Sequence, residues 1–361
     1  MIDLLLSTPN IAALVISLLA CMLTVLTKNW HGRYTLDDIN GVQKSHTQST
    51  PRVGGVAIFI GISCAAPLTD QATRQLLYPT LLACAPAFIF GLTEDLTKRV
   101  RAIHRLLATL ASGALGCYLT GVSLTSVGVP GLDQLLAFGT FSVFFTVFAI
   151  GGVSNAVNLI DGYNGIASGF VVLALLAVAY IAGDQGDAAL AQTAMLATAG
   201  FLGFFLVNWP FGRLFLGDSG AYLGGFLVAW LFVLLTQRNE LVSPFAALLV
   251  CAHPITETLY SLWRRLKSGD NPGLPDAMHL HNLICNRLLP MVNGRMEIAN
   301  PLSGLVMVFL SMTSVLLASG NYTSGSWCAS LSLIYILLFV AVYLTLTKGL
   351  QKRFSKNSET P

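Results

Sequence analysis

Long apolar runs alternate with short polar junctions along nearly the whole chain. Eleven runs approach or exceed the length that an α-helix needs to cross a bilayer, which is roughly 20 predominantly apolar residues. The pattern therefore predicts an all-α polytopic membrane protein with about 11 transmembrane helices. The run at 53–68 is short and the run at 104–120 carries Arg105 near its start, so these two are the least typical. The runs lie at about 4–26, 53–68, 75–92, 104–120, 134–154, 166–183, 189–207, 219–236, 244–263, 301–319 and 327–347.

The composition agrees with this pattern. Of the 361 residues, 54% are hydrophobic and only 10% are charged, and the mean hydropathy is +0.70. Soluble globular chains carry about 25% charged residues, so the deficit indicates a chain that lies mostly in lipid. The sequence contains no internal repeat of solenoid period and no low-complexity tract. We predict a single integral membrane domain over residues 1–347, followed by a basic cytoplasmic tail over residues 348–361.

Basic residues are distributed unequally between the two sides of the predicted helices. If alternate junctions lie on opposite sides of the membrane, one side collects 18 of the 20 Lys and Arg residues and the other has only Arg74 and Arg238. Because basic loops stay in the cytoplasm, this bias predicts an N-terminus outside and a C-terminus inside. The first run is followed, and not preceded, by a basic residue, which is typical of a retained helix. Attraction to anionic lipid explains the net charge of +3 without a nucleic-acid partner.

Carboxylates gather at three junctions on the predicted cytoplasmic side. Glu94 and Asp95 end the third run, and Asp161 follows the fifth run in the stretch NAVNLIDGYNG. Asp218 precedes the eighth run in the stretch FLGDSGAYLGG. All three junctions contain glycines and interrupt apolar sequence, and ionisable groups at such positions are candidates for function. Three junctions of this kind on one face predict a shared site.

These residue types suit phosphoryl chemistry with a divalent metal. Mg²⁺ binds through a few carboxylates, keeps some waters and takes its other oxygens from substrate phosphates. Phosphoryl transfer itself depends mainly on positioning and on neutralisation of charge. Cations for phosphate follow the ninth run, where Arg264, Arg265 and Lys267 precede a segment that contains His279 and His281.

Each of these elements also has a purely structural interpretation. The pair Glu94 and Asp95, followed by KRVR, is compatible with a salt-bridge cluster at the membrane boundary. Asp218 is compatible with an N-terminal helix cap that the helix dipole favours, and RRLK after a span is typical of a topology anchor. His253 and Glu257 lie four residues apart and would meet on one helical face, where a buried structural pair is the expected reading.

Taken in order, the motifs resemble those of a known family. The chain is similar to the bacterial polyprenyl-phosphate N-acetylhexosamine-1-phosphate transferases, which include the initiating enzymes of enterobacterial antigen and teichoic acid and the phospho-N-acetylmuramoyl-pentapeptide transferase. Each motif alone is weak, but the ordered set covers most of the chain on a matching helix count. The motifs are KSHTQSTPRVGG (44–55), GLTED (91–95), NAVNLIDGYNG (155–165), FLGDSGAYLGG (215–225) and PDAMHLHNL (275–283).

The resemblance implies a reaction and its partners. Enzymes of this family transfer a sugar 1-phosphate from a UDP-sugar to a lipid phosphate, usually undecaprenyl phosphate, and release UMP. The polyprenyl diphosphate sugar that they form initiates a cell-envelope glycan, such as a cell-wall or O-antigen polymer. We therefore expect a multi-pass enzyme of the bacterial inner membrane, in contact with membrane lipid, with its active site on the cytoplasmic face. Mg²⁺ is the expected cofactor, with Mn²⁺ as a substitute. The sequence leaves open whether the protein forms a homodimer.

The resemblance also implies roles for single residues. Asp218 takes the position of the magnesium ligand, and Asp161 is the second candidate ligand. Glu94 and Asp95 match an Asp-Asp pair near the lipid phosphate, and these four acids are the expected catalytic residues. Substrate binding is expected from a further set, in which Asn208 matches a residue facing the nucleotide and two histidines lie in the cytoplasmic loop 264–299. The set comprises Lys44, Asn155, Asn158, Asn208, Arg264, Arg265, His279 and His281.

The chain departs from the family's pattern at several positions. The acidic pair is Glu-Asp and not Asp-Asp. Asn164 stands where the family has a second Asp, so this position cannot supply a base or a charged ligand. In the loop, Ala277 and Asn282 replace an Arg and a His. The missing phosphate contact is therefore expected from another basic residue, Arg264, Arg265 or Arg287, unless the donor is bound differently.

Two functions of other classes stay open on the sequence. A transporter or flippase of lipid-linked sugars would carry ionisable residues near the middle of several helices, together with internal repeats. Only His253 and Glu257 fit that position. A non-catalytic scaffold of envelope assembly would tolerate the changes at Asn164 and Ala277. The acids gathered at one membrane boundary favour the transferase.

Overall fold

The computed structural model describes residues 2–37, 49–270 and 276–358. Over these ranges the chain is helical, as predicted, and its only β-type pairing is an isolated bridge between Leu36 and Pro51. The helices are α1 (Ile2–Leu5), α2 (Thr8–Leu26), α3 (Lys28–Thr35), α4 (Gly54–Ala65), η1 (Ala66–Leu68), α5 (Gln71–Ala83), α6 (Ala85–Thr97), α7 (Ala102–Thr120), α8 (Leu132–Leu136), α9 (Gly139–Leu159), α10 (Ile166–Asp184), α11 (Ala188–Asn208), α12 (Gly217–Arg238), α13 (Pro244–Val250), α14 (Ala252–Ser268), α15 (Leu280–Leu288), η2 (Leu289–Val292), α16 (Met296–Asn321) and α17 (Gly325–Ser358).

Many of these helices have the length and composition of membrane spans. In the described part of the chain, eight helices qualify, or up to ten if each of two bent pairs counts as one span. The bent pairs are α5 with α6, at 46°, and α13 with α14, at 70°. The predicted run at 53–68 forms α4 and η1, an apolar piece that is shorter than a typical span. A multi-pass all-α membrane protein is confirmed, whereas the count of eleven spans and the orientation of the chain ends stay predictions.

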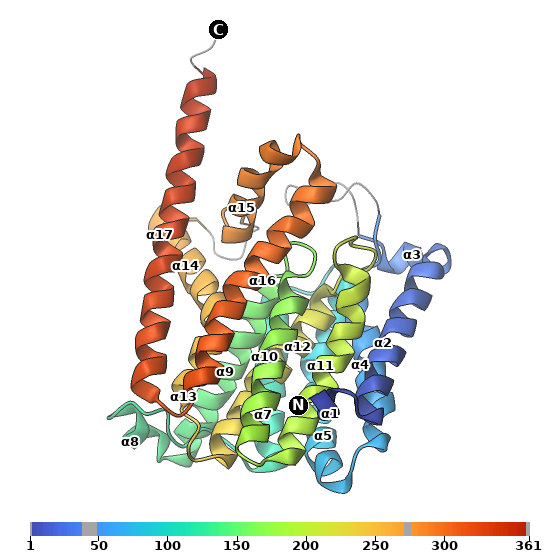
Figure 1. Cartoon of the computed structure of the whole chain (residues 1–361), viewed down its shortest axis with the longest axis vertical. Helices are drawn as coiled ribbons and strands as arrows, with labels where there is room; N and C mark the ends of the chain where they lie inside the picture. The colour runs from blue at the N-terminus through green and yellow to red at the C-terminus, as the bar shows by residue number, and fades with distance from the viewer. Residues whose placement is uncertain (1, 38–48, 271–275, 359–361) are drawn as a thin grey trace.

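The long helices run side by side as one bundle, with α15 and the C-terminal part of α17 at one end and α8 at the other (Figure 1). Helix α12 packs against α4, α6, α9 and α10. Every residue from Gly217 to Leu235 is buried, as expected for a helix that is apolar on all sides. Small residues allow the tight contacts, since a Cβ on Gly225 would lie only 2.6 Å from the Cα of Ser154 in α9.

Two helices come especially close to the first turn of α12. In α4, a Cβ on Gly55 would lie 2.3 Å from the backbone nitrogen of Gly220. In α6, a Cβ on Gly91 would lie 2.7 Å from the Cα of Ser219. Neither distance leaves room for a side chain, so glycine is required at both positions for the helices to approach this turn.

The segment before α4 is also tied to the segment before α12. The N–H of Gly54 donates to the carbonyl oxygen of Phe215 (3.0 Å), and the N–H of Phe215 donates to that of Pro51 (2.9 Å). These backbone hydrogen bonds join residues that are more than 150 positions apart in the sequence. They bring Arg52 to the N-terminus of α12.

Replacing Gly55 by alanine is expected to lower the stability of the protein by about 1–3 kcal/mol, the usual cost of forcing extra atoms into a packed contact. The measurement is the apparent melting temperature of the detergent-solubilised protein. Gly152→Ala is the control, because a Cβ at that position meets no atom within 4 Å and alanine favours a helix. An unchanged melting temperature for Gly55→Ala would contradict the close approach of α4 to α12.

Candidate active site

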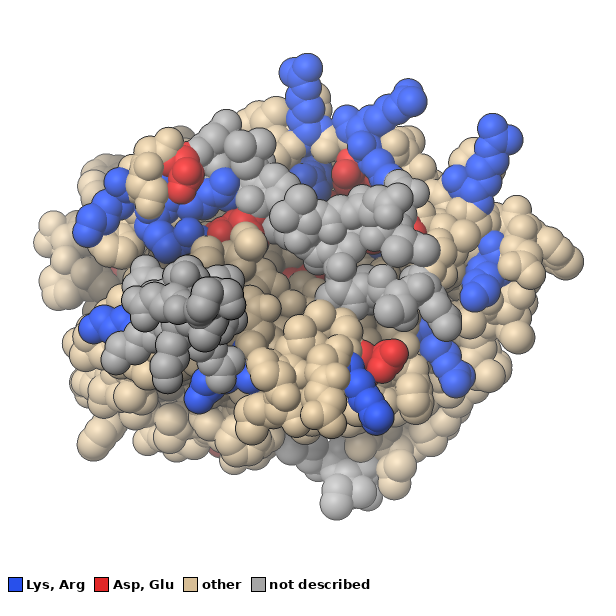
Figure 2. Space-filling model, turned by 90° about the horizontal axis from the view of Figure 1, so that it is seen from above, with Lys and Arg blue, Asp and Glu red and all other residues tan. Residues whose placement is uncertain are grey.

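The end of the bundle that bears α15 is rich in basic side chains. Figure 2 looks onto this end and shows many Lys and Arg side chains around it, with a few Asp and Glu side chains among them. A cavity of about 680 Å³ lies here, between the ends of α7, α9 and α14 and the start of α15. Seven of the predicted site residues line the cavity: Asn155, Asn158, Asp161, Asn208, Arg265, His279 and His281.

Five other predicted residues do not line this cavity or lie outside the described residues; Asp95 and Asp218 are described below, and the remaining three are Glu94, Arg264 and Lys44. Glu94 accepts a hydrogen bond from the backbone N–H of Val100 (2.7 Å), which stabilises the turn after α6. Arg264 forms an ion pair with Asp276, at the edge of the site. Lys44 lies outside the described residues. The predicted roles of these three residues stay predictions.

Asp95 caps the N-terminus of α12 from the neighbouring helix α6. Its carboxylate accepts hydrogen bonds from the backbone N–H groups of Asp218 (2.7 Å) and Ser219 (2.9 Å) and from the hydroxyl of Ser219 (2.6 Å). Helix α12 has no capping side chain of its own, although the first N–H groups of a helix need acceptors. Asp95 supplies them, and the positive end of the helix dipole favours its charge.

Asp218 is the second residue of α12, and both of its carboxylate oxygens bind arginines. The guanidinium of Arg52 donates to Oδ1 at 2.5 Å, and that of Arg105, from the first turns of α7, donates to Oδ2. The interpretation of Asp218 as the cap of its own helix is therefore wrong, because Asp95 is the cap. Asp218 is 1% exposed, so its charge is compensated almost entirely by these two cations.

Asp161 is one of three acids that line the cavity, together with Asp37 and Asp276. It lies in the turn between α9 and α10 and, among the described residues, its carboxylate makes no hydrogen bond or ion pair with the protein. Burial raises the pKa of Asp161 to about 7, with the positive charge of Arg52 lowering it and the charges of Asp218 and Asp95 raising it further. This carboxylate is available to a ligand in the cavity.

Asn155 and Asn158 lie in the last turns of α9 and are oriented by neighbouring side chains. The amide nitrogen of Asn155 donates to the hydroxyl of Thr109 (2.9 Å) and to the carbonyl of Gly151 (2.8 Å). The side-chain carbonyl of Asn158 accepts from the hydroxyl of Tyr222 (3.4 Å). The other amide atom of each asparagine has no partner among the described residues and is free to contact a ligand.

Asn208 lines the cavity but uses its amide to join two loops. Its side-chain oxygen accepts from the N–H of Gly165 (2.7 Å), and its nitrogen donates to the carbonyl of Leu214 (2.8 Å). Asn164 reinforces the junction by donating to the carbonyl of Pro210 (3.1 Å). Asn164, which departs from the family's aspartate, thus holds the wall of the site.

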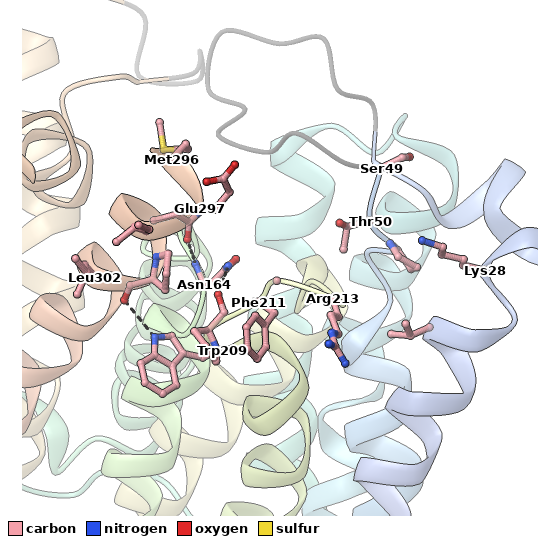
Figure 3. Close-up of a pocket in the computed structure, with 17 residues that line it drawn as sticks. Lys28, Ser49, Thr50, Asn164, Trp209, Phe211, Arg213, Met296, Glu297 and Leu302 are labelled. Carbon is pink, nitrogen blue, oxygen red and sulfur yellow. Dashed lines mark hydrogen bonds between the residues drawn. The ribbon is translucent and has the colours of Figure 1, made fainter. Parts of the chain in front are cut away.

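A second cavity, of about 520 Å³, lies on the other side of Asn164 (Figure 3). Trp209, Phe211 and Leu302 provide much of its apolar lining, and the guanidinium of Arg213 lies over the ring of Phe211 at 5.2 Å. None of the described residues that were predicted as site residues lines this second cavity. The first cavity is therefore the candidate active site.

Glu257 holds His279 and the start of α15. One carboxylate oxygen accepts from His279 Nδ1–H (3.0 Å) and from the backbone N–H of Leu280 (3.0 Å), the first residue of α15. The sequence had paired Glu257 with His253 on one helical face. Instead, His253 Nδ1 bonds to the hydroxyl of Tyr335 (3.1 Å), and Glu257 reaches from α14 to the histidine-bearing loop.

His281 is buried under the turn that carries Asp161. A Cβ on Gly162 would lie 2.3 Å from His281 Nε2, and the ring of Tyr163 meets the imidazole edge-on at 5.5 Å between centroids. Burial lowers the pKa of His281 to about 3, so its ring is neutral at neutral pH. The ring stacks on that of His279, with 5.3 Å between centroids, and its neutrality avoids two adjacent positive charges.

Asp276 anchors the segment before the histidines to α14. It accepts hydrogen bonds from the hydroxyl of Ser261 (2.7 Å), from the backbone N–H of Met278 (2.9 Å) and from the guanidinium of Arg264. Although burial raises the pKa of Asp276, these hydrogen bonds and nearby positive charges bring it below its usual value. The carboxylate is therefore ionised at neutral pH and keeps its partners.

Several charged side chains at the site were not predicted from the sequence: Asp37, Arg52, Arg105 and Asp276, which line the cavity, and Glu257, which holds His279. Arg52 was counted in the charge bias of the loops and within the motif at 44–55, and Arg105 was noted as a charge near the start of the run at 104–120, but neither was given a role in the site. Arg105 nevertheless lies inside a predicted span, and an ionisable group there is itself a signal of function. Glu257 is likewise an ionisable group inside a predicted span. Its partner, His279, lies 22 positions away in the sequence and is identified only by the fold.

Comparison with known proteins agrees with the motifs. The sequence profile of glycosyl transferase family 4 matches residues 77–236. The chain is 30% identical over 260 residues to the undecaprenyl-phosphate alpha-N-acetylglucosaminyl 1-phosphate transferase of Yersinia pestis, an alignment that covers 69% of each chain. It is 29% identical over 259 residues, again 69% of each chain, to the protein of the same description from Escherichia coli strain K12. A probable undecaprenyl-phosphate N-acetylglucosaminyl 1-phosphate transferase of Bacillus subtilis strain 168 is 25% identical over 350 residues, which covers 95% of this chain and 94% of the relative.

Asp95→Asn and Asp161→Asn are expected to affect stability in opposite ways. The amide of Asp95→Asn would turn an N–H group toward the donors of α12, so we expect a loss of about 1.5–3 kcal/mol, typical of hydrogen bonds to a charged group. Asp161→Asn removes a carboxylate without protein partners, so its melting temperature is expected to equal or exceed that of the wild type. Thermal unfolding in detergent measures both, and the reverse order would contradict the capping role of Asp95.

The buried, neutral state of His281 is expected to make the protein sensitive to acid. The unfolded histidine titrates near pH 6.5, and the folded one only near 3. The unfolded state therefore binds more protons below pH 6.5, so stability is complete above that value and falls as the pH drops toward 3. We expect the melting temperature to fall between pH 7 and 5, and His281→Gln to reduce this slope. His104→Gln, at an exposed position, is the control, and an equal slope in wild type and His281→Gln would refute the assignment.

Proposed function

Because the chain belongs to glycosyl transferase family 4, we propose that it transfers a sugar 1-phosphate from a UDP-sugar to undecaprenyl phosphate. The products are a polyprenyl diphosphate sugar and UMP, and the reaction initiates a cell-envelope glycan. An N-acetylhexosamine 1-phosphate is the proposed group, since the relatives from Yersinia pestis and Escherichia coli are N-acetylglucosaminyl 1-phosphate transferases by description.

The observation that carries this proposal is the composition of the cavity at the end of the helical bundle. One carboxylate without protein partners, Asp161, lines it together with the guanidinium groups of Arg52, Arg105 and Arg265. Arginine binds phosphate oxygens in pairs through its planar fork. A lipid phosphate reaches the end of a membrane-spanning helix directly from the bilayer surface, so both phosphate-bearing substrates have access to the same cations.

The proposed location is the bacterial inner membrane, with the cavity on the cytoplasmic face. The basic end of the bundle supports this orientation, because Lys and Arg are retained on the cytoplasmic side (Figure 2). UDP-sugars are cytoplasmic metabolites, so a site on this side meets its donor. The same basic surface attracts the anionic headgroups of the inner leaflet.

We propose Mg²⁺, with Mn²⁺ as a substitute, as the cofactor. No three His, Cys, Asp or Glu side chains of the described residues are grouped to hold a metal on their own. Mg²⁺ does not need such a group, since it uses one or two carboxylates with waters and substrate phosphates. Asp161 and Asp218, close enough for the charge of one to raise the pKa of the other, fit this mode. When bound, the ion would neutralise the donor diphosphate and stabilise the leaving UMP.

The residues of the chain would mainly bind and orient the reactants. A phosphate oxygen of the lipid attacks the sugar-bearing phosphorus in line, and UMP leaves from the opposite side. Because a lipid phosphate is already ionised at neutral pH, the attack needs no protein base, and we assign Asp95 to the positioning of α12. Glu257 orients His279 at the cavity, and neutral His281 supports it from below.

A transporter has less support from the positions of the charged groups. The residues that favoured this function were His253 and Glu257, which the sequence placed near the middle of a span. Glu257 bonds instead to His279 in the loop at the cavity. Within the described ranges, no other observation favours transport over group transfer.

The proposal is tested by measuring UMP release from membranes or purified protein with undecaprenyl phosphate, Mg²⁺ and a panel of UDP-sugars. We expect release that requires all three components and the lipid product by mass analysis. Asp161→Asn and Asp218→Asn are expected to reduce the rate by at least about 100-fold, as for the loss of a residue that stabilises transferring phosphate. Arg74→Gln, on the opposite predicted side, is the matched control with unchanged turnover.

Two results would count against the proposal. Absence of UMP release from every UDP-N-acetylhexosamine in the panel would exclude the transferase as stated. Wild-type turnover in Asp218→Asn would exclude a metal-binding role for that residue while leaving the reaction in place.

A further inference from the structure

Asp218 carries two cations on one carboxylate. Arg52 binds one oxygen and Arg105 the other, and the side chain of Asp218 is only 2% exposed. Single surface ion pairs contribute little, but a buried carboxylate that is bound on both oxygens is a specific arrangement with a desolvation cost for each charge. The chain places two arginines from different elements, α7 and the segment before α4, on this one acid.

The two guanidinium groups stand between Asp218 and the cavity. Their side chains are 33% and 22% exposed and line the cavity, whereas Asp218 does not. Arg52 Nε also lies 3.5 Å from Asp95 Oδ1. Each arginine therefore touches the buried acids on one side and faces the space for ligands on the other.

The charges of this cluster do not balance. Four carboxylates, Asp37, Asp95, Asp161 and Asp218, lie within electrostatic reach of Arg52, and Arg52 and Arg105 supply two positive charges. A divalent cation on the carboxylates would balance the remaining negative charge with both arginines still present. With the cation compensating the acids, the two guanidinium groups could turn to the negative charge that a diphosphate and a phosphate bring into the site.

We propose that Arg52 and Arg105 compete with a divalent cation for Asp218 and are themselves the phosphate-binding residues of the reaction. Binding of the cation transfers Asp218 to the metal and turns the two guanidinium groups to phosphate oxygens across the cavity. Guanidinium suits this exchange because its fork binds carboxylate and phosphate with the same geometry. The inference rests on the proposed function for the identity of the phosphates. Its test by metal binding does not depend on turnover.

The first test is Mn²⁺ binding to the full-length, detergent-solubilised protein, with free Mn²⁺ followed by electron paramagnetic resonance. Arg52→Gln and Arg105→Gln are expected to bind Mn²⁺ about tenfold more tightly than the wild type, because a competing charge is removed from Asp218. Arg101→Gln, at an exposed position at the start of α7, is the matched control with wild-type affinity. Adding Asp218→Asn to Arg105→Gln is expected to abolish the gain.

A purely structural role of the arginines predicts the opposite result. If they only support the fold, their removal weakens or leaves unchanged the binding of Mn²⁺, and that outcome overturns the proposal. Because the variants leave a buried acid with fewer partners, their melting temperatures are measured with and without Mg²⁺. A larger rise with Mg²⁺ in Arg105→Gln than in the wild type supports the exchange, and an equal or smaller rise contradicts it.

The second test separates the two sources of phosphate. Binding of UDP-N-acetylglucosamine and of a short polyprenyl phosphate is measured for each variant in the presence of saturating Mn²⁺. If the substitution of one arginine weakens the binding of one ligand about tenfold, that arginine is assigned to the phosphate of that ligand. The ligand is then either the donor diphosphate or the lipid phosphate. Unchanged binding of both ligands in both variants overturns the phosphate-binding role.

The two proposals fail in different ways. A wild-type protein that binds Mn²⁺ at Asp218 but releases no UMP from any UDP-sugar would refute the proposed reaction and leave the competition at Asp218 standing. A wild-type protein that releases UMP, combined with unchanged Mn²⁺ affinity in both arginine variants, would refute the competition alone.

Discussion

The rest of the site depends on the capping of α12 by Asp95. A helix that begins inside a bundle of membrane helices exposes N–H groups that water cannot reach, and each unpaired group costs free energy. Asp95 accepts hydrogen bonds from two of these N–H groups, those of Asp218 and Ser219, and from the hydroxyl of Ser219. It reaches them because glycines in α4 and α6 let both helices touch the first turn of α12. The same approach buries Asp218, whose charge then requires the two arginines.

A second pair of carboxylates holds the part of the cavity wall that α14 and α15 form. Glu257 binds His279 and the first N–H of α15, and Asp276 ties the preceding residues to α14. In both places an acid on one helix accepts hydrogen bonds from N–H groups at the start of another helix. Asp95 of α6 does so at the start of α12, and Glu257 of α14 does so at the start of α15. Such bonds place the polar groups accurately without flexible surface loops, and pre-organised charge of this kind is what phosphoryl transfer requires.

Much of the helical fold and part of the candidate site could be predicted from the sequence alone. The lengths of the apolar runs indicated a multi-pass helical membrane protein, although not the number of spans, and the run at 53–68 was recognised as short. Asp161, which the sequence singled out in a polar junction, lines the cavity, while its predicted role stays a prediction. The roles of Asp95 and Asp218 were harder, because the donors to Asp95 lie 123 and 124 positions away, and local spacing suggested that Asp218 capped its own helix. Glu257 was assigned to the wrong partner for the same reason, since helical periodicity relates only neighbours on one helix.

The sequence by itself determined the class of protein, many of its long helices and the junctions at which acids gather, because hydrophobic length and charge act on each segment separately. Only the tertiary structure decided which acids face a ligand and which hold the fold. Asp95, Asp161 and Asp218 are equivalent as residue types, and they differ in what the packing of distant helices places around them. Asp95 meets helix N–H groups, Asp218 meets arginines, and Asp161 meets the cavity, because a carboxylate's function is set by the donors and the solvent that its neighbours leave to it.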